Sequence, residues 1–383
     1  MEDYPKGFEE FSEARRNGFI KVKELKDEGK KIVGTFCTFT PVEIIFAAGA
    51  IPVSLCGMSD EPISDAEIDL PQNLCPLIKS SYGFAITKTC PYTYFADLIV
   101  GETTCDGKKK MYEYLGEIKN VHVMQLPQNL ERKDSFNLWK NEILYLKEKL
   151  ENDFDVIITK EDIKESIKAR NKERLLLQEF YDLQKLCPPP ISGYEIHKVL
   201  EGSSFNLDKH KQNISLKEMI EDIKHSYENG QRKISKNAKR ILITGCPIGG
   251  VADKIIKSIE ENNNAVVVCY ENCSGVKEKS RLVDESIDPI DALTEKYINI
   301  GCSVMSPNNN RISLLNELID EYKVEGVIEV VLQACHTYAV ETKKIREFVT
   351  KDKEIPYMAL ETSYSSSDIG QVKTRISAFI EML

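Results

Sequence analysis

The chain contains eleven cysteines, the residues with the widest choice of chemistry in this sequence. An odd number of cysteines cannot all pair, and stable disulfides are not expected in a reducing compartment. The thiols could be buried and inert, reactive, or ligands of a metal or an iron-sulfur cluster. No CxxC pair occurs, which disfavours a zinc ribbon or a bacterial ferredoxin spacing. A metal centre would therefore need cysteines that folding brings together from distant parts of the chain.

Most of these cysteines fall near the ends of expected strands. Those at or just beyond such an end are Cys37, Cys56, Cys90, Cys105, Cys246, Cys273 and Cys335. In open α/β sheets, ligands bind at the connections after the carboxyl ends of strands, because side chains there face a crevice. Cysteines that only fill a core should lie within strands and helices, as Cys269 does. The residues alone leave a buried cluster and ordinary thiols as equal alternatives.

Several polar side chains near the thiols could transfer protons to a bound substrate. The candidates are Glu102, His336, Tyr338, Glu361 and Tyr364. The competing interpretation gives each of them an ordinary structural hydrogen bond.

Other polar stretches favour ordinary explanations. The loop at 245–250, GCPIGG, could cradle a phosphate, but it matches neither GxGxxG nor GxxxxGK(S/T), so we favour a simple turn. The lysines at 108–110 are expected to form a solvated helix start rather than an anion-binding patch. We expect His197, His210 and His225 at the surface rather than as ligands.

Short apolar strands alternate with amphipathic helices along both halves of the chain. The expected strands lie at 31–36, 51–55, 96–100, 120–127, 240–245, 265–271, 326–332 and 357–362. This alternation predicts an α/β fold with two doubly wound, largely parallel-sheet domains, flavodoxin-like or Rossmann-like, joined by a helical segment. The expected segments are an N-terminal helical segment (1–30), a first α/β domain (31–158), a helical bridge (159–238) and a second α/β domain (239–383).

Length and charge limit the function classes. A chain of 383 residues can bury two ordinary cores. The net charge of -10 argues against a nucleic-acid binder. The charged N-terminus resembles neither a signal peptide nor a membrane anchor, and no apolar run approaches the roughly 20 residues that a membrane span needs. We therefore expect a cytoplasmic protein.

Five blocks of the sequence resemble the 2-hydroxyacyl-CoA dehydratase family of iron-sulfur proteins. The blocks are residues 37–57, 73–83, 89–111, 331–338 and 361–383. In dehydratase subunits of that family, three cysteines hold one 4Fe-4S cluster. The resemblance implies that Cys75, Cys105 and Cys335 fill this role here.

Three further blocks resemble a subgroup of that family, the double-cubane cluster proteins, in which two 4Fe-4S units share a bridging sulfide (8Fe-9S). They are GCPIGG, ENCSG and NIGCSVMSPNNNR. The second ligand set implied by this resemblance is Cys246, Cys273 and Cys302. For this second set, Cys37, Cys56 and Cys90 stay open as alternatives.

The resemblance also implies an activity and a partner. Family members receive low-potential electrons from a separate ATP-hydrolysing iron-sulfur reductase, and this chain has no Walker A motif of its own. We expect an anaerobic reductase of a small molecule, assembled as a homodimer, with Glu102, His336 and Tyr338 as catalytic candidates. The alternatives are a single-cluster 2-hydroxyacyl-CoA dehydratase subunit and a non-enzymatic electron-storage protein.

Overall fold

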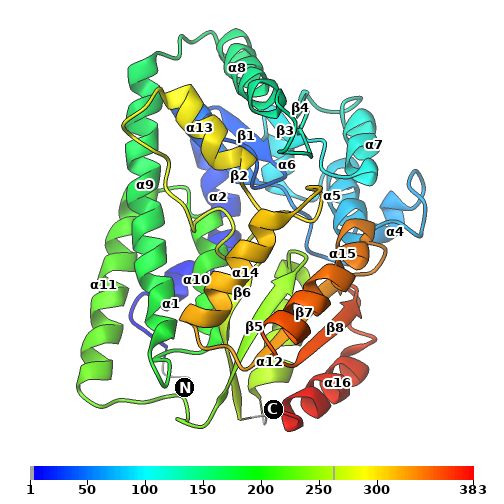
Figure 1. Ribbon diagram of the computed structural model, residues 1–383. Coiled ribbons are helices and arrows are strands. Elements are labelled where there is room, and N and C mark those ends of the chain that lie inside the picture. Colours follow the sequence, from blue (N-terminus) through cyan, green and yellow to red (C-terminus); the bar gives the residue numbers. More distant parts are fainter. Residues whose placement is uncertain (1–3, 262–263) are drawn as a thin grey trace. The chain divides into compact units, whose positions relative to one another are not determined.

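The computed structural model describes residues 4–261 and 264–383, which form two compact units (Figure 1). Each unit is assembled from separate parts of the chain and is named here after its sheet. The sheet A unit comprises residues 16–175 and 280–310, and the sheet B unit comprises residues up to 15, 176–279 and 311–383. Among the described residues, no helix combines the length and the apolar character that a membrane span requires.

Sheet A contains four parallel strands in the order β2-β1-β3-β4. The strands are β1 (Ile32–Thr35), β2 (Ile51–Ser54), β3 (Leu98–Glu102) and β4 (Val121–Met124). Strand β3 is buried along its whole length, as its apolar run predicts. Strand β3 begins two residues later than predicted, because the carboxylate of Asp97 binds the neighbouring strand β1. This carboxylate accepts the Ile32 N–H at 2.8 Å and pairs with Lys26.

Sheet B repeats this arrangement, with four parallel strands in the order β6-β5-β7-β8. The strands are β5 (Lys239–Gly245), β6 (Ala265–Glu271), β7 (Gly326–Leu332) and β8 (Tyr357–Thr362). The three strands β5, β6 and β7 carry long apolar runs, as expected of parallel strands that are covered on both faces. The predicted α/β fold with two parallel-sheet domains is confirmed.

Helices connect the strands of both sheets. The sheet A unit contains α3 (Val42–Ala47), α4 (Ile63–Ala66), α5 (Pro76–Thr87), α6 (Pro91–Phe95), α7 (Asp106–Leu115), α8 (Ser135–Phe154) and α13 (Pro289–Ile298). The sheet B unit contains α1 (Phe8–Ser12), α10 (Gly193–Phe205), α11 (Lys209–Glu228), α12 (Ala252–Glu260), α15 (His336–Glu347) and α16 (Ile369–Glu381). Helices α2 (Ala14–Asp27), α9 (Lys160–Asp182) and α14 (Asn309–Glu321) contain three of the points at which the chain passes between units, and the fourth lies between residues 279 and 280. Shorter turns form η1 (Leu183–Lys185), η2 (Gly249–Val251) and η3 (Phe348–Asp352).

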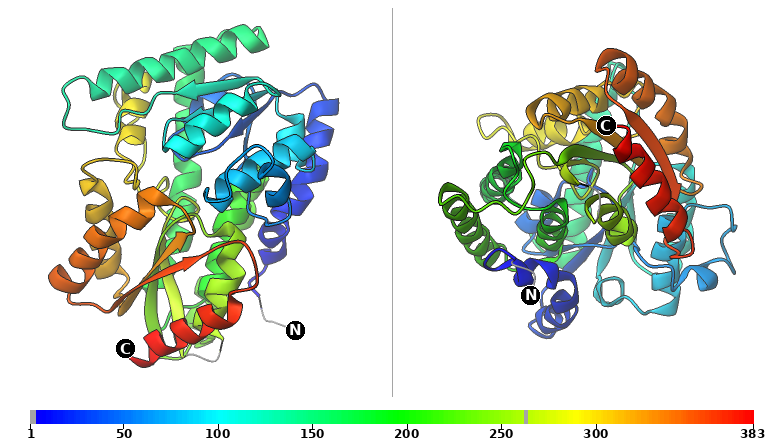
Figure 2. Two further views of the ribbon diagram at one scale, coloured as in Figure 1. Left: turned by 90° about the vertical axis from the view of Figure 1, so that its right-hand side faces the viewer. Right: turned by 90° about the horizontal axis from the view of Figure 1, so that it is seen from below.

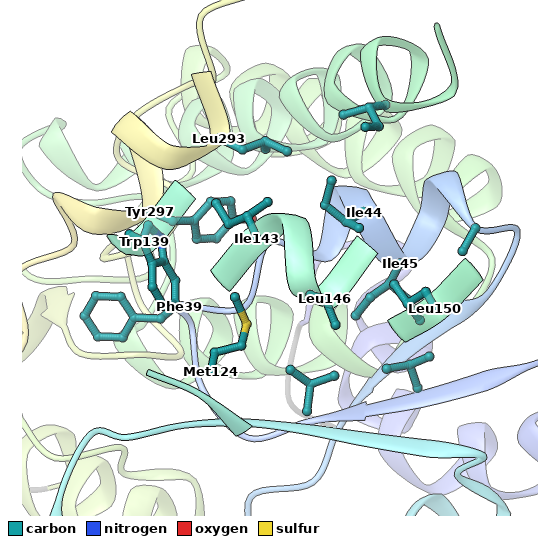
Figure 3. Close-up of a cluster of buried hydrophobic side chains, with 14 of the residues drawn as sticks. Phe39, Ile44, Ile45, Met124, Trp139, Ile143, Leu146, Leu150, Leu293 and Tyr297 are labelled. Atoms are coloured by element: carbon teal, nitrogen blue, oxygen red, sulfur yellow. The ribbon is translucent and has the colours of Figure 1, made fainter. Parts of the chain in front are cut away.

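The core of the sheet A unit lies between sheet A and the helices α3, α8, α9 and α13; Figure 3 shows part of it. Helix α8 supplies Trp139, Ile143, Leu146 and Leu150, all fully buried. Their spacing of three and four residues places them on one face of the helix. Helices α3, α9 and α13 also contribute to this core, so a segment near residue 293 packs with strands that begin before residue 100. The sequence did not predict α13.

In the sheet B unit, α12 and α16 pack side by side along sheet B (Figure 2). Helix α10 packs against β6, and this contact buries His197, which is only 2% exposed. The prediction that His197 lies at the surface is therefore wrong. Its ring lies 5.8 Å from that of Tyr270, and burial lowers the pKa of the imidazole. Residues 159–238, the predicted helical bridge, contain α9, η1, α10 and α11, and they divide between the two units.

Candidate functional site

Three cysteines of the sheet A unit lie just beyond the carboxyl ends of adjacent strands. Cys37 follows β1, Cys56 follows β2 and Cys105 follows β3, each within three residues of the strand's last residue. Because the strands are parallel, these ends lie along one edge of the sheet. Strands β1 and β3 are neighbours whose connections run in opposite directions, which is the position where open α/β sheets bind ligands.

The sheet B unit places three cysteines in the same way. Cys246 follows β5, Cys273 follows β6 and Cys335 follows β7, again within three residues. The strands β6, β5 and β7 are adjacent, so these cysteines also follow one edge. The Cys246 sulfur is fully buried and accepts the Leu332 N–H at 3.3 Å. Hydrogen bonds to the sulfurs of an iron-sulfur cluster tune its reduction potential.

Two predicted site cysteines lie elsewhere. Cys90 caps α6 and precedes β3, so the prediction that it lies at a strand's carboxyl end is wrong. The cause is a short helix, α6, between Cys90 and the strand. Cys302 lies between α13 and α14, is 8% exposed, and belongs to the hydrophobic core of the sheet A unit. The predicted second set therefore draws Cys302 from one unit and Cys246 and Cys273 from the other.

Cys75 and Cys105 occupy the N-cap positions of two helices, α5 and α7, that pack together at their starts. A Cβ atom on Gly107 would lie 2.9 Å from side-chain carbons of both Leu74 and Ile78, so glycine permits this close approach. Neither sulfur caps its helix by a side-chain hydrogen bond. The positive end of a helix stabilises a thiolate placed there.

Cys335 is the N-cap of α15 in the sheet B unit, in the same way. Cys75, Cys105 and Cys335 thus all occupy helix N-cap positions. Soft thiolates are the ligands that iron-sulfur clusters use. These three cysteines are of the chemical type that an iron-sulfur cluster requires as ligands. Within residues 4–261 and 264–383, however, no three His, Cys, Asp or Glu side chains are grouped closely enough to hold an ion, and no cysteine forms a disulfide.

A buried lysine lies beside the thiols of sheet A. The Phe36 carbonyl oxygen accepts hydrogen bonds from Lys108 Nζ at 3.0 Å and from Cys56 Sγ at 3.1 Å. The amine and the thiol are therefore within about 6 Å of each other through this shared acceptor. Lys108 is only 8% exposed, so the prediction that it is solvated is wrong, whereas Lys109 and Lys110 are exposed as expected.

Sequence periodicity could have identified Lys108. The inward face of α7 consists of Lys108, Met111, Tyr112 and Leu115, and this spacing places the lysine on the apolar side of the helix. Burial by itself would lower the pKa of Lys108, but nearby acidic groups outweigh it and hold the pKa well above its ordinary value. The amine therefore stays charged.

Glu102, the last residue of β3, is fully buried. One carboxyl oxygen accepts a hydrogen bond from the Thr40 hydroxyl, and the other has no hydrogen-bond partner among the described residues. Burial raises the pKa of Glu102 to about 7, although the Thr40 hydrogen bond and the Lys108 charge act in the opposite direction. This carboxyl group can therefore hold or release a proton near neutral pH.

Tyr338 is the buried polar group at the edge of sheet B. Its hydroxyl accepts a hydrogen bond from Lys277 Nζ at 2.8 Å, and Lys277 also pairs with Glu271 at 2.9 Å. Arg311 pairs with the same Glu271 at 3.1 Å. Burial opposes ionisation of Glu271, yet these two cations lower its pKa below the ordinary value. Sequence reasoning missed both Lys277 and Arg311, because their partners are distant in the chain.

The remaining acid-base candidates have different surroundings. His336 begins α15 and its side chain is exposed. Glu361 is exposed near the end of β8, and Tyr364 is buried. The catalytic roles of Glu102, His336 and Tyr338 stay predictions, and the surroundings of Glu102 and Tyr338 suit proton transfer from a buried site.

Comparison with known proteins identifies the family. The family model described as "2-hydroxyglutaryl-CoA dehydratase, D-component" matches residues 37–383. The chain is 52% identical over 381 residues to "Putative dehydratase subunit YjiM" of Escherichia coli strain K12, covering 100% of this chain and 99% of that protein. It is 24% identical to the (R)-phenyllactyl-CoA dehydratase beta subunit of Clostridium sporogenes, covering 100% of both chains. It is also 21% identical to a subunit of benzoyl-CoA reductase from Thauera aromatica, covering 93% of this chain and 92% of that protein. The chain therefore belongs to the 2-hydroxyglutaryl-CoA dehydratase D-component family, as the sequence blocks predicted.

Proposed function

We propose that this protein is a reductase with a double-cubane iron-sulfur cluster, 8Fe-9S. It would reduce a small substrate with low-potential electrons from a separate ATP-hydrolysing iron-sulfur reductase, and would act as a homodimer. The observation that carries the proposal is the row of cysteines after adjacent strands in both sheets. Four of the six proposed ligands, Cys105, Cys246, Cys273 and Cys335, belong to these rows, whereas Cys75 and Cys302 lie outside them. When bound, the cluster would supply low-potential electrons.

The first proposed ligand set is Cys75, Cys105 and Cys335, and the second is Cys246, Cys273 and Cys302. Cys37 and Cys56 remain alternatives for the second set, because they follow β1 and β2 at the same edge as Cys105. Cys90 is the less favoured alternative, because it lies before β3 rather than after a strand.

A reduction consumes protons together with electrons, and the chain offers two buried donors. Glu102 holds its proton near neutral pH and lies three residues before Cys105. The Tyr338 hydroxyl is held by Lys277 and lies three residues after Cys335. We propose that these two groups deliver protons to the substrate, and that exposed His336 exchanges protons with solvent.

Anaerobic purification followed by iron and acid-labile sulfide analysis tests the cluster type. Iron equal to two cubanes per chain supports the proposal, and iron equal to one cubane removes the double-cubane assignment. A chain without iron refutes every cluster-based function. Turnover of an unsaturated small molecule with reductant, ATP and the partner reductase then separates an enzyme from an electron-storage protein.

A pair of matched variants tests the ligand assignment. Cys105→Ala should lose cluster iron while staying folded, because the substitution removes only a sulfur at a helix N-cap. Cys90→Ala is the control, since Cys90 is also a helix N-cap of the sheet A unit but lies away from the carboxyl edge. It should keep its iron. Equal iron content in the two variants would remove Cys105 from the ligand set.

A single-cluster dehydratase subunit is the second candidate, favoured by the names of the family and of its relatives. In that case one 4Fe-4S cluster on Cys75, Cys105 and Cys335 would serve dehydration of a 2-hydroxyacyl-CoA. Conversion of a 2-hydroxyacyl-CoA to the unsaturated thioester, with no net consumption of reductant, would support this candidate over the reductase.

A further inference from the structure

Cys37 and Cys56 are two cysteines of the sheet A unit that the preferred ligand sets do not use. Both are half-buried. They follow β1 and β2, which are neighbouring parallel strands. Their position relative to each other therefore follows from the register of these two strands.

The register of β1 and β2 makes the two cysteines neighbours. Thr35 pairs with Ser54 at the end of the ladder. The Leu55 N–H donates to the Thr35 carbonyl oxygen at 2.9 Å, which continues the ladder by one residue. Cys37 and Cys56 each lie two residues beyond the last pair, so the same register places them opposite each other. Neighbouring strands lie about 4.8 Å apart, and disulfides join cysteines whose Cα atoms are about 4.4–6.8 Å apart.

The direction of the side chains also favours a pair. Successive side chains of a strand point to opposite faces of the sheet, so residues four apart share a face. Val33 belongs to the hydrophobic core of the sheet A unit, and Cys37, four residues later, packs against the same core. Opposite neighbours in a sheet point to the same face, so the register assigns Cys56 to the face of Cys37.

A hydrogen bond joins Cys56 to the main chain beside Cys37. The Cys56 thiol donates to the Phe36 carbonyl oxygen at 3.1 Å. This oxygen belongs to the trans peptide bond that precedes Cys37, and in such a bond it lies about 2.8 Å from the following Cα atom. The Cys56 sulfur is therefore within about 6 Å of the Cys37 Cα atom. Rotation about the side-chain bonds of both cysteines can then bring the sulfurs to the bonding distance of about 2.05 Å.

A disulfide at this position leaves the buried main chain satisfied. Oxidation removes the thiol hydrogen that the Phe36 carbonyl oxygen accepts from Cys56. Lys108 Nζ donates to the same oxygen at 3.0 Å, so this acceptor keeps a hydrogen-bond partner. The disulfide therefore forms without leaving a buried acceptor unpaired, which would oppose it.

We propose that Cys37 and Cys56 form a reversible oxidation site, separate from the cluster ligands, that hydrogen peroxide converts to a disulfide. One thiol reduces the peroxide, which releases a water molecule and leaves a sulfenic acid; the second thiol attacks this sulfur and releases a second water molecule. One S–S bond replaces two S–H bonds, and the peroxide takes up two electrons and two protons. The site depends neither on the cluster type nor on the proposed reduction.

Peptide mapping of the anaerobically purified full-length protein tests the pair. The protein is titrated with diamide, which accepts the same two electrons and two protons, and the remaining thiols are alkylated with iodoacetamide. A protease that cleaves after glutamate separates the two cysteines at Glu43, and mass spectrometry identifies the linked peptides. The link between Cys37 and Cys56 should form before any other link of the sheet A unit, and dithiothreitol should reverse it. If Cys37 stays open to alkylation, or joins another cysteine instead, the proposal is refuted.

Serine variants separate this pair from the cluster ligands. Cys56→Ser should leave Cys37 open to alkylation after diamide treatment and should keep the iron content of the wild type. Cys90→Ser is the control, because Cys90 is another half-buried cysteine of the sheet A unit outside the preferred ligand sets, and it should form the link as the wild type does. Loss of iron in Cys56→Ser would make Cys56 a ligand and overturn the pair. A wild type without iron would refute the cluster-based function alone, since the peptide map does not depend on iron.

Discussion

The buried carboxyl group of Glu102 yields a quantitative prediction about stability and pH. Burial raises its pKa to about 7, from an ordinary value of 4.5. Between these pH values the folded chain keeps a proton that the unfolded chain has released. The free energy of unfolding contributed by this group is therefore complete below about pH 4.5 and falls as the pH rises to about 7. The difference between the two pKa values corresponds to about 3 kcal/mol, at about 1.4 kcal/mol per pH unit.

The substitution Glu102→Gln isolates this contribution. Glutamine has the same shape and can still accept the Thr40 hydrogen bond, but it cannot ionise. Relative to the wild type, the variant should gain up to about 3 kcal/mol in its free energy of unfolding between pH 5 and pH 8. Burial also raises the pKa of Glu260 to about 7. Because both proteins contain Glu260, its pH dependence cancels in the comparison.

Urea unfolding, followed by tryptophan fluorescence, measures the free energy of unfolding of the sheet A unit. Trp139 is the single tryptophan of the chain and is fully buried in the core of the sheet A unit, which also contains Glu102. Glu117→Gln, an exposed carboxyl in the same unit, is the control and should follow the wild type at every pH. If the wild type and Glu102→Gln keep the same difference in stability from pH 5 to pH 8, the assigned protonation of Glu102 is wrong.

Two structural contacts of the sheet B unit give further predictions, each measured by thermal unfolding with circular dichroism. Arg311→Met removes the cation that pairs with the buried carboxylates of Glu271 and Glu329 at 3.1 and 3.0 Å. The variant should lose about 3–5 kcal/mol of its free energy of unfolding. An unchanged midpoint of thermal unfolding would contradict this. Gly202→Ala would place a Cβ 2.1 Å from a main-chain oxygen of α1, and should cost about 1–3 kcal/mol. Gly370→Ala, with open space around its Cβ, should be neutral or stabilising, and equal losses in the two glycine variants would refute the steric argument.

Local sequence signals were sufficient to predict a strand or a helix start wherever the residues that define it lie close together in the chain. The strand preceding Cys105 is one such case, because a run of five buried residues has few alternatives in an α/β chain. The N-cap positions of Cys75 and Cys105 are another. Cys75 precedes a proline in the first turn of α5, and Cys105 precedes the charged start of α7. Both signals are local, so these helix starts can be read from the sequence.

Tertiary contacts decided the features that the sequence missed. The start of α13 is marked by an aspartate N-cap, Asp288, and by Pro289, so the helix itself was detectable. Its packing against α8 was not, because the contact joins segments about 150 residues apart and depends on the path of the whole chain. The burial of His197 beneath β6 has the same origin. A helix pattern shows which face is apolar but does not identify the partner that covers it.

The two sheets repeat one topology but present different chemistry at their edges. Lys108 and Tyr338 both lie three residues after an N-cap cysteine, and both are buried. In sheet A this position supplies a cation that shares an acceptor with Cys56, whereas in sheet B it supplies a hydroxyl held by Lys277. Cys56 donates its thiol hydrogen to the Phe36 carbonyl, and it follows β2 at the same edge of sheet A as Cys105. Cys56 therefore stays an alternative for a place in the second ligand set, and iron analysis of Cys56→Ala beside Cys302→Ala would decide between them.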